Sequence, residues 1–144
     1  MKRTKVDKIY SSEIADSTSR PMFSAKVPAG FPSPADDYIE SSLDLNRHLI
    51  KHPAATFFVR VSGDSMIEAG IQDGDILIVD RSLAAQDRSV VIAKIDGELT
   101  VKRIRIHENK LELIPENADY KIRAIDKDVD FEVWGVVIHA IHSF

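Results

Sequence analysis

The chain has 144 residues, a formal net charge of −4 and no cysteine, which fits a single soluble domain and excludes disulfides, thiolate catalysis and zinc–thiolate sites. Residues 1–30 hold six basic and three acidic side chains, whereas the remainder holds 13 basic and 20 acidic ones, so the body is poorly suited to binding DNA phosphates. No apolar run reaches the roughly 20 residues that cross a bilayer, and the first residues lack the apolar core of a signal peptide, so we expect a cytoplasmic protein.

Residues 1–33 are expected to form an extended N-terminal arm. Its centre, the stretch VPAGFPSP at 27–34, cannot be helical, because each residue that precedes a proline is pushed toward extended backbone. The prolines therefore hold the small Ala29–Gly30 peptide bond in a rigid and unobstructed ribbon. Apolar side chains that could dock the arm on a surface are Met22, Phe23, Val27 and Phe31.

Residues 34–144 are predicted to form a mostly β, compact domain with a barrel-like or sandwich core. The stretch LDLNRHLIKHP at 43–53 first predicts a short helix, capped by Asn46 and ending before Pro53. Apolar, β-rich runs then predict strands within 55–63, 74–80, 89–106, 110–115 and 130–141, with a turn region at 116–122. Asp96–Gly97 divides the run 89–106 into a hairpin, because this dipeptide suits a two-residue turn with positive φ angles.

Lys102, in the second strand of this hairpin, is a candidate general base. Alternation along a strand puts it on one face with Ile104 and Ile106, so its ammonium group leads an apolar row. Desolvation lowers the pKa of a lysine, which a lysine acting as a base requires. Taken alone, the alternation favours the plainer alternative, a lysine that reaches solvent or pairs with an acid.

Ser65 is a candidate nucleophile in the stretch VSGDSM at 61–66. Gly63 allows a sharp turn after a strand, and a serine beyond such a turn presents its hydroxyl beside backbone N–H groups that can form an oxyanion hole. A serine needs a base to take its proton; no Ser-His-Asp set stands out, but a Ser–Lys pair follows the same logic. Two alternatives stay open: the stretch is only a polar turn, or Ser62 is the nucleophile.

In combination, these features resemble the LexA/UmuD-type family of self-cleaving Ser–Lys peptidases. The matching stretches are AGFPSPADDY at 29–38, LDLN at 43–46, SGDSM at 62–66, DGDILIVD at 73–80, DGELTVK at 96–102 and GVVIH at 135–139. The resemblance covers roughly residues 21–142. A serine in SGDSM, a lysine 37 positions later and an upstream Ala-Gly bond together make a specific signature.

This resemblance implies roles for individual residues. Ser65 would be the nucleophile and a deprotonated Lys102 its general base, with the backbone N–H groups of Asp64 and Ser65 holding the oxyanion. The scissile bond would be Ala29–Gly30, so that cleavage removes a 29-residue arm and leaves 115 residues. Met22, Phe23 and Phe31 would hold the arm on the body, and no cofactor is implied.

The resemblance also implies partners. It predicts a homodimer whose self-cleavage is promoted by the RecA–single-stranded DNA filament in the SOS response. The trimmed dimer would join a UmuC-like subunit in an error-prone translesion DNA polymerase. Only 29 residues precede the cleavage site and they show no helix-turn-helix pattern, so we expect no sequence-specific DNA binding. A repressor-like regulator that lacks its DNA-binding domain stays an alternative.

Two further classes of function stay open. The acidic body and apolar arm would also suit a non-catalytic interaction module that regulates a polymerase, and a trans-acting peptidase similar to signal peptidases would share the Ser–Lys chemistry. A metal site is not expected: His48 and His52 are four residues apart on the predicted helix, but no third ligand is in view. His139 and His142 are an odd number apart on a predicted strand and should face opposite sides.

Overall fold

The computed structural model describes residues 3–12, 19–23 and 39–144. The chain separates into two compact units, one made of residues 1–12 and 52–144 and the other of residues 13–51. We call the described part of the first unit the β body and that of the second the small unit. Among the described residues, no helix is long and apolar enough to cross a membrane.

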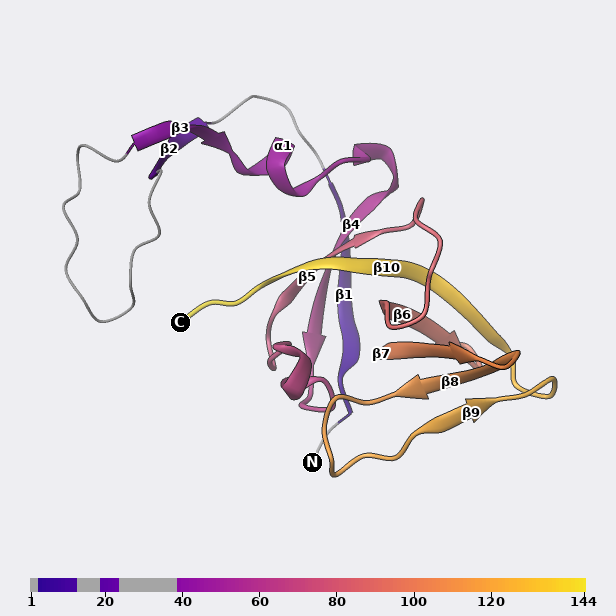
Figure 1. Cartoon of the computed structure of the whole chain (residues 1–144). Helices are drawn as coiled ribbons and strands as arrows, with labels where there is room; N and C mark the ends of the chain where they lie inside the picture. The colour runs from indigo at the N-terminus through magenta and orange to yellow at the C-terminus, as the bar shows by residue number, and fades with distance from the viewer. Residues whose placement is uncertain (1–2, 13–18, 24–38) are drawn as a thin grey trace. The chain divides into compact units, whose positions relative to one another are not determined.

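The β body is built on one antiparallel sheet. Its strands are β1 (Lys5–Ser11), β4 (Thr56–Ser62), β5 (Ile76–Asp80), β6 (Val90–Ile95), β7 (Glu98–His107), β8 (Lys110–Ile114), β9 (Arg123–Ile125) and β10 (Phe131–Ile141). They lie in the order β1-β4-β5-β10-β6-β7-β8-β9, and a further pairing of β1 with β7 closes the part from β1 to β7 into a barrel (Figure 1). The prediction of a mostly β, compact domain is confirmed.

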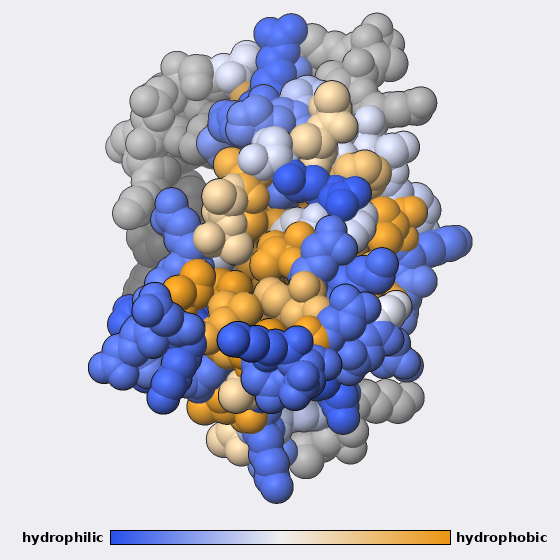
Figure 2. Space-filling view, turned by 90° about the vertical axis from the view of Figure 1, so that its right-hand side faces the viewer, coloured by the Kyte–Doolittle hydropathy of each residue, from blue (hydrophilic) through white to orange (hydrophobic). Residues whose placement is uncertain are grey.

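The core of the β body consists of two clusters of buried apolar residues, which explains the unbroken apolar runs in the sequence. The first cluster consists of Val59, Val61, Met66, Ile71, Leu77, Val79, Ile92 and Val101. The second cluster consists of Val91, Ala93, Ile95, Ile104, Leu113 and Val136. Ile92 of β6 belongs to the first cluster, whereas its neighbours Val91 and Ala93 belong to the second, so both faces of β6 are buried. On β7, Val101 packs in the first cluster and Ile104 in the second. Figure 2 shows one face of the molecule, on which apolar patches lie among hydrophilic side chains.

The predicted hairpin is present, with β6 and β7 joined at Asp96–Gly97. Both turn residues have positive φ angles, 49° for Asp96 and 84° for Gly97, as a two-residue hairpin turn requires. The apolar row expected beside Lys102 is shorter than predicted. Ile104 is buried, but Ile106 is 42% exposed, because the end of β7 extends with β8 beyond the second cluster.

The small unit holds a two-stranded antiparallel sheet, β2 (Ser19–Phe23) and β3 (Ile39–Asp44), followed by the helix α1 (Leu45–Leu49). The predicted cap, Asn46, is wrong. Asp44 has extended backbone and its carboxylate accepts a hydrogen bond of 3.1 Å from the Asn46 N–H, so Asp44 is the cap and Asn46 lies in the first turn. Because α1 ends at Leu49, His52 lies beyond it and does not share a helix face with His48.

The predicted boundary between arm and domain, at 33/34, lies outside the described residues and stays a prediction. The structure adds one fact about the start of that arm: its residues 5–11 form β1, which pairs along β4 within the β body (Figure 1). Short 3-10 helices at Pro53–Ala55 and Ile67–Ala69 flank β4 on either side in sequence.

Candidate active site

Ser65 lies on a tight turn between β4 and the 3-10 helix Ile67–Ala69. The turn begins at Gly63, whose φ of 97° favours glycine, and the Gly63 N–H donates a hydrogen bond of 2.8 Å to the Asp73 carboxylate. It ends at Met66, which is fully buried in the first cluster. Ser65 itself is fully buried, so its hydroxyl is held between two anchored neighbours rather than on a loose loop.

Lys102 of β7 points its ammonium group at this serine, with Nζ 3.3 Å from Ser65 Oγ. Burial, together with the positive charge of Arg3, lowers the pKa of Lys102 from 10.5 to about 8. Within the described residues, no acid forms an ion pair with Lys102. A substantial fraction of the side chain is therefore neutral near pH 8 and able to accept a proton from the serine.

Two hydrogen bonds to the Asp64 carbonyl oxygen hold the peptide unit between Asp64 and Ser65. The Asn117 side chain donates a hydrogen bond of 2.9 Å to the Asp64 carbonyl oxygen, to which the Ile67 N–H also donates at 3.2 Å. The carbonyl and N–H of a trans peptide point in opposite directions. Fixing the Asp64 carbonyl therefore fixes the direction of the Ser65 N–H, one of the two groups expected to bind an oxyanion.

Tyr120 holds the same turn through a side chain. Its hydroxyl donates a hydrogen bond of 2.6 Å to the Asp64 carboxylate. Partial desolvation and this hydrogen bond raise the pKa of Tyr120 to about 12, so the hydroxyl stays protonated and keeps donating. The ring also lies 5.8 Å from Lys102 Nζ, and the aromatic face stabilises the charged ammonium. From sequence alone, residues 116–122 are predicted only as a turn region, which assigns no role to Asn117 or Tyr120.

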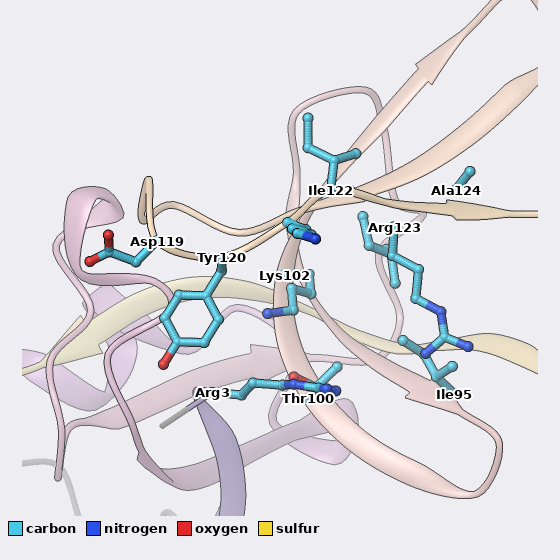
Figure 3. Close-up of a pocket in the computed structure, with 11 residues that line it drawn as sticks. Arg3, Ile95, Thr100, Lys102, Asp119, Tyr120, Ile122, Arg123 and Ala124 are labelled. Atoms are coloured by element: carbon cyan, nitrogen blue, oxygen red, sulfur yellow. The ribbon is translucent and has the colours of Figure 1, made fainter. Parts of the chain in front are cut away.

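A cavity of about 550 Å³ opens beside Lys102. Its lining residues are Arg3, Ile95, Thr100, Lys102, Leu113, Asp119, Tyr120, Lys121, Ile122, Arg123 and Ala124. Figure 3 shows Lys102, Tyr120 and Arg3 around one side of this space and Ala124 at the other. The cavity gives solvent and peptide groups a route to the lysine, whereas Ser65 is fully buried and is not among the residues that line the cavity.

Ser62 is the one further candidate for the serine–lysine chemistry that lies in the described part of the β body. The rival serine, Ser62, donates a hydrogen bond of 2.9 Å to Asp7 rather than meeting Lys102. Met22 and Phe23 lie on β2, in the small unit. The bond Ala29–Gly30 and Phe31 lie outside the described residues, so their place relative to Ser65 stays a prediction.

Two of the four histidines considered above, His52 and His142, each pair with a different carboxylate. His52 Nδ1 lies 2.6 Å from the Asp80 carboxylate, and His142 Nδ1 lies 2.8 Å from the Asp75 carboxylate. No group of three or more His, Asp or Glu side chains that could hold a metal ion occurs within the described part of the chain. Each pair joins a buried aspartate to a more exposed histidine.

We predict that Asn117→Ala slows any reaction at Ser65 by about tenfold. Removing an oxyanion-hole donor outright costs about 100-fold or more, but here the Ile67 N–H still holds the Asp64 carbonyl, so the loss should be smaller. The rate of the self-cleavage expected from the sequence motifs, measured by intact mass, checks this. Tyr120→Phe is the matched control, because it loses only the bond to the Asp64 carboxylate and should cost less; equal losses would contradict a role for the carbonyl contact.

Comparison with known proteins finds a peptidase family and relatives that agree with the resemblance of the motifs. A family model described as Peptidase S24-like matches residues 21–138, close to the range 21–142 over which the motifs carry the resemblance. Protein MucA of Salmonella typhimurium is 44% identical over 138 residues, which cover 95% of this chain and 94% of the relative. Protein ImpA of Escherichia coli is 47% identical over 128 residues, covering 88% and 86%, and Protein SamA of Salmonella typhimurium LT2 is 44% identical over 126 residues, covering 88% and 87%.

Proposed function

The chain belongs to the Peptidase S24-like family, and we propose that it is a self-cleaving serine peptidase whose Ser65–Lys102 pair cuts its own Ala29–Gly30 bond. The observation that carries this proposal is the distance of 3.3 Å between Lys102 Nζ and Ser65 Oγ. The lowered pKa of Lys102, about 8, supports the same assignment, because a serine hydroxyl becomes a nucleophile only when a neutral base can take its proton.

The proposed reaction has two halves. Neutral Lys102 takes the proton of Ser65 as Oγ attacks the carbonyl carbon of Ala29, and the oxyanion accepts hydrogen bonds from the backbone N–H groups of Asp64 and Ser65. Protonated Lys102 then gives its proton to the Gly30 nitrogen, the C–N bond breaks, and residue 29 is left as an ester on Ser65. In the second half Lys102 takes a proton from a water molecule as the water oxygen attacks the ester carbon. Protonated Lys102 then returns this proton to Ser65 Oγ as the C–Oγ bond breaks, and the arm leaves as a carboxylic acid that ionises in solution.

The biological setting of the proposal comes from the family resemblance. It consists of a homodimer, cleavage promoted by the RecA–single-stranded DNA filament in the SOS response, and a trimmed dimer that serves as accessory subunit of a UmuC-like translesion polymerase. The acidic excess of residues 31–144 fits a protein that contacts DNA only through its partners, because a surface with excess carboxylates binds phosphates poorly.

Intact mass measurement of the purified chain tests the proposal. After incubation near pH 7 and near pH 9, with and without activated RecA filament, we expect fragments of 29 and 115 residues that meet at Ala29–Gly30, formed faster at the higher pH. A chain that stays intact under all four conditions would instead support the non-catalytic interaction module. Turnover of an added, unrelated peptide with the chain's own bond left uncut would support the trans-acting peptidase.

A further inference from the structure

The N-terminal residues Arg3, Thr4 and Lys5 lie directly against the proposed nucleophile. The backbone N–H of Thr4 donates a hydrogen bond of 2.7 Å to Ser65 Oγ, shorter than the distance from this oxygen to Lys102 Nζ. Thr4 is fully buried, and Arg3 lines the cavity beside the lysine (Figure 3). A segment about 60 positions away in sequence therefore covers the serine.

Backbone contacts on both sides hold this segment as a short strand. Lys5 pairs with Ser62 at the end of β4 and also with Thr100 of β7. The Thr4 carbonyl oxygen accepts a hydrogen bond of 2.9 Å from the Thr100 hydroxyl and lies 3.5 Å from the Val101 N–H, which donates to it. The segment thus occupies the gap between β4 and β7 in front of Ser65.

An extended substrate segment that approaches Ser65 needs the same gap. Peptides bind along strands through main-chain hydrogen bonds, and here Thr4 and Lys5 already use the backbone partners on both sides. The segment that carries Ala29–Gly30 and the segment that carries Thr4 are therefore mutually exclusive at the serine.

The bound segment is not itself in position to be cut. It presents an N–H group to Ser65 Oγ, not a carbonyl carbon, and this hydrogen bond takes up one of the two lone pairs of that oxygen. The contact blocks the nucleophile without offering it a bond to break, which is the behaviour of a competitive inhibitor.

We propose that residues 3–5 are an internal competitive inhibitor, and that self-cleavage requires this segment to leave the gap between β4 and β7. The proposal rests on the function proposed above and adds its regulation. One feature suits a segment that must leave: the Thr4 hydroxyl is buried and has no hydrogen-bond partner among the residues that the structure describes, which destabilises the occupied state. Any factor that draws β1 away from its position would then activate the serine.

A pair of substitutions at Thr4 tests the proposal with opposite expected signs. Thr4→Pro removes the N–H that binds Ser65, and position 4 directly precedes the first residue of β1, where proline is tolerated, so we expect self-cleavage to become about five- to tenfold faster. Thr4→Val keeps the N–H and the shape but removes the unpartnered hydroxyl, so we expect cleavage to become about fivefold slower.

A second readout separates this proposal from the proposed function. The rate at which diisopropyl fluorophosphate modifies Ser65, followed by intact mass with Ser65→Ala as blank, reports access to the nucleophile whether or not the chain cuts itself. We expect this rate to rise in Thr4→Pro and fall in Thr4→Val. Modification that rises in Thr4→Pro while no variant cuts itself would support the inhibitor and contradict the self-cleaving peptidase.

Equal modification rates in wild type, Thr4→Pro and Thr4→Val would overturn the inhibitor, even if all three cut themselves. Thermal unfolding shows whether Thr4→Pro is folded. If it is not, Thr100→Val gives the same test from the other strand, because it removes the hydroxyl that binds the Thr4 carbonyl. We expect Thr100→Val to raise both rates by about threefold, and unchanged rates in it would overturn the proposal as well.

Discussion

Lys102→Ala is expected to slow self-cleavage of the purified chain by about a thousandfold. A positioned general base contributes about 10²- to 10⁴-fold, and no other described side chain that can act as a base lies within hydrogen-bond distance of Ser65 Oγ. Lys102→Arg should be as inactive, because a guanidinium does not give up its proton in this pH range. The rate of appearance of the 115-residue fragment measures both.

The rate of self-cleavage of the wild type should increase with pH. Only neutral Lys102 accepts a proton, and its pKa is about 8, so the rate should rise about tenfold per pH unit below 8 and level off above it. Lys94→Ala is the matched control, since Lys94 lies exposed on β6 of the same hairpin, and it should cut like the wild type. Undiminished cutting by Lys102→Ala, or a flat profile between pH 6 and 9, would refute the role of this lysine.

The serine is tested in the same assay. Ser65→Ala should be inactive, whereas Ser62→Ala should retain cutting, because the Ser62 hydroxyl binds Asp7 and not the lysine. The reverse result would move the nucleophile to Ser62.

Most of the β body could be predicted from sequence because its strands carry local signals. The hairpin at Asp96–Gly97 is one example, since a two-residue turn with positive φ angles needs these residue types whatever surrounds it. The segment Ile76–Asp80 is another, because an unbroken apolar run between aspartates fits a strand buried on both faces. The resemblance of the motifs to a peptidase family is confirmed by the family match over residues 21–138.

Strand β1 could not be predicted from its own sequence. Its residues, KVDKIYS, are largely polar and show no alternation, and most of them are exposed. It is a strand because β4 offers a free edge to pair with, and the register shifts between Val6 and Lys8 along that edge. Pairing at this distance in sequence leaves no local pattern, so the sequence predicts only an extended arm for these residues and gives no sign of their contact with Ser65.

The site also contains some residues that could be predicted from sequence and others that could not. Ser65 could be singled out because a glycine and a small polar residue mark a sharp turn, and Lys102 because it interrupts a strand face. Their meeting across 37 positions depends on the barrel, which brings the end of β4 and the middle of β7 together. Asn117 and Tyr120 gave no signal of their own, because polar and aromatic residues in a turn are ordinary and only their contacts with Asp64 give them a role.

Met66→Ala is expected to be the most informative change in the core. Met66 is fully buried in the first cluster, so its truncation should lower the free energy of unfolding by about 2–5 kcal/mol. It also directly follows Ser65, and its carbonyl oxygen accepts hydrogen bonds from the N–H groups of Ala69 and Ile71. A turn that relaxes into the new cavity displaces the serine, and a displacement of about 1 Å can cost about 100-fold in rate.

Leu77→Ala separates the two effects of Met66→Ala. Leu77 of β5 is equally buried in the same cluster but is not next to Ser65, so we expect a similar loss of unfolding free energy in urea and a loss of cleavage below about threefold. Met66→Leu, which roughly conserves volume, should restore most of both quantities. If Met66→Ala and Leu77→Ala lost equal stability and equal activity, the buried methionine would serve the core alone, and the position of Ser65 would depend on the hydrogen bonds of Gly63 and Asp64 instead.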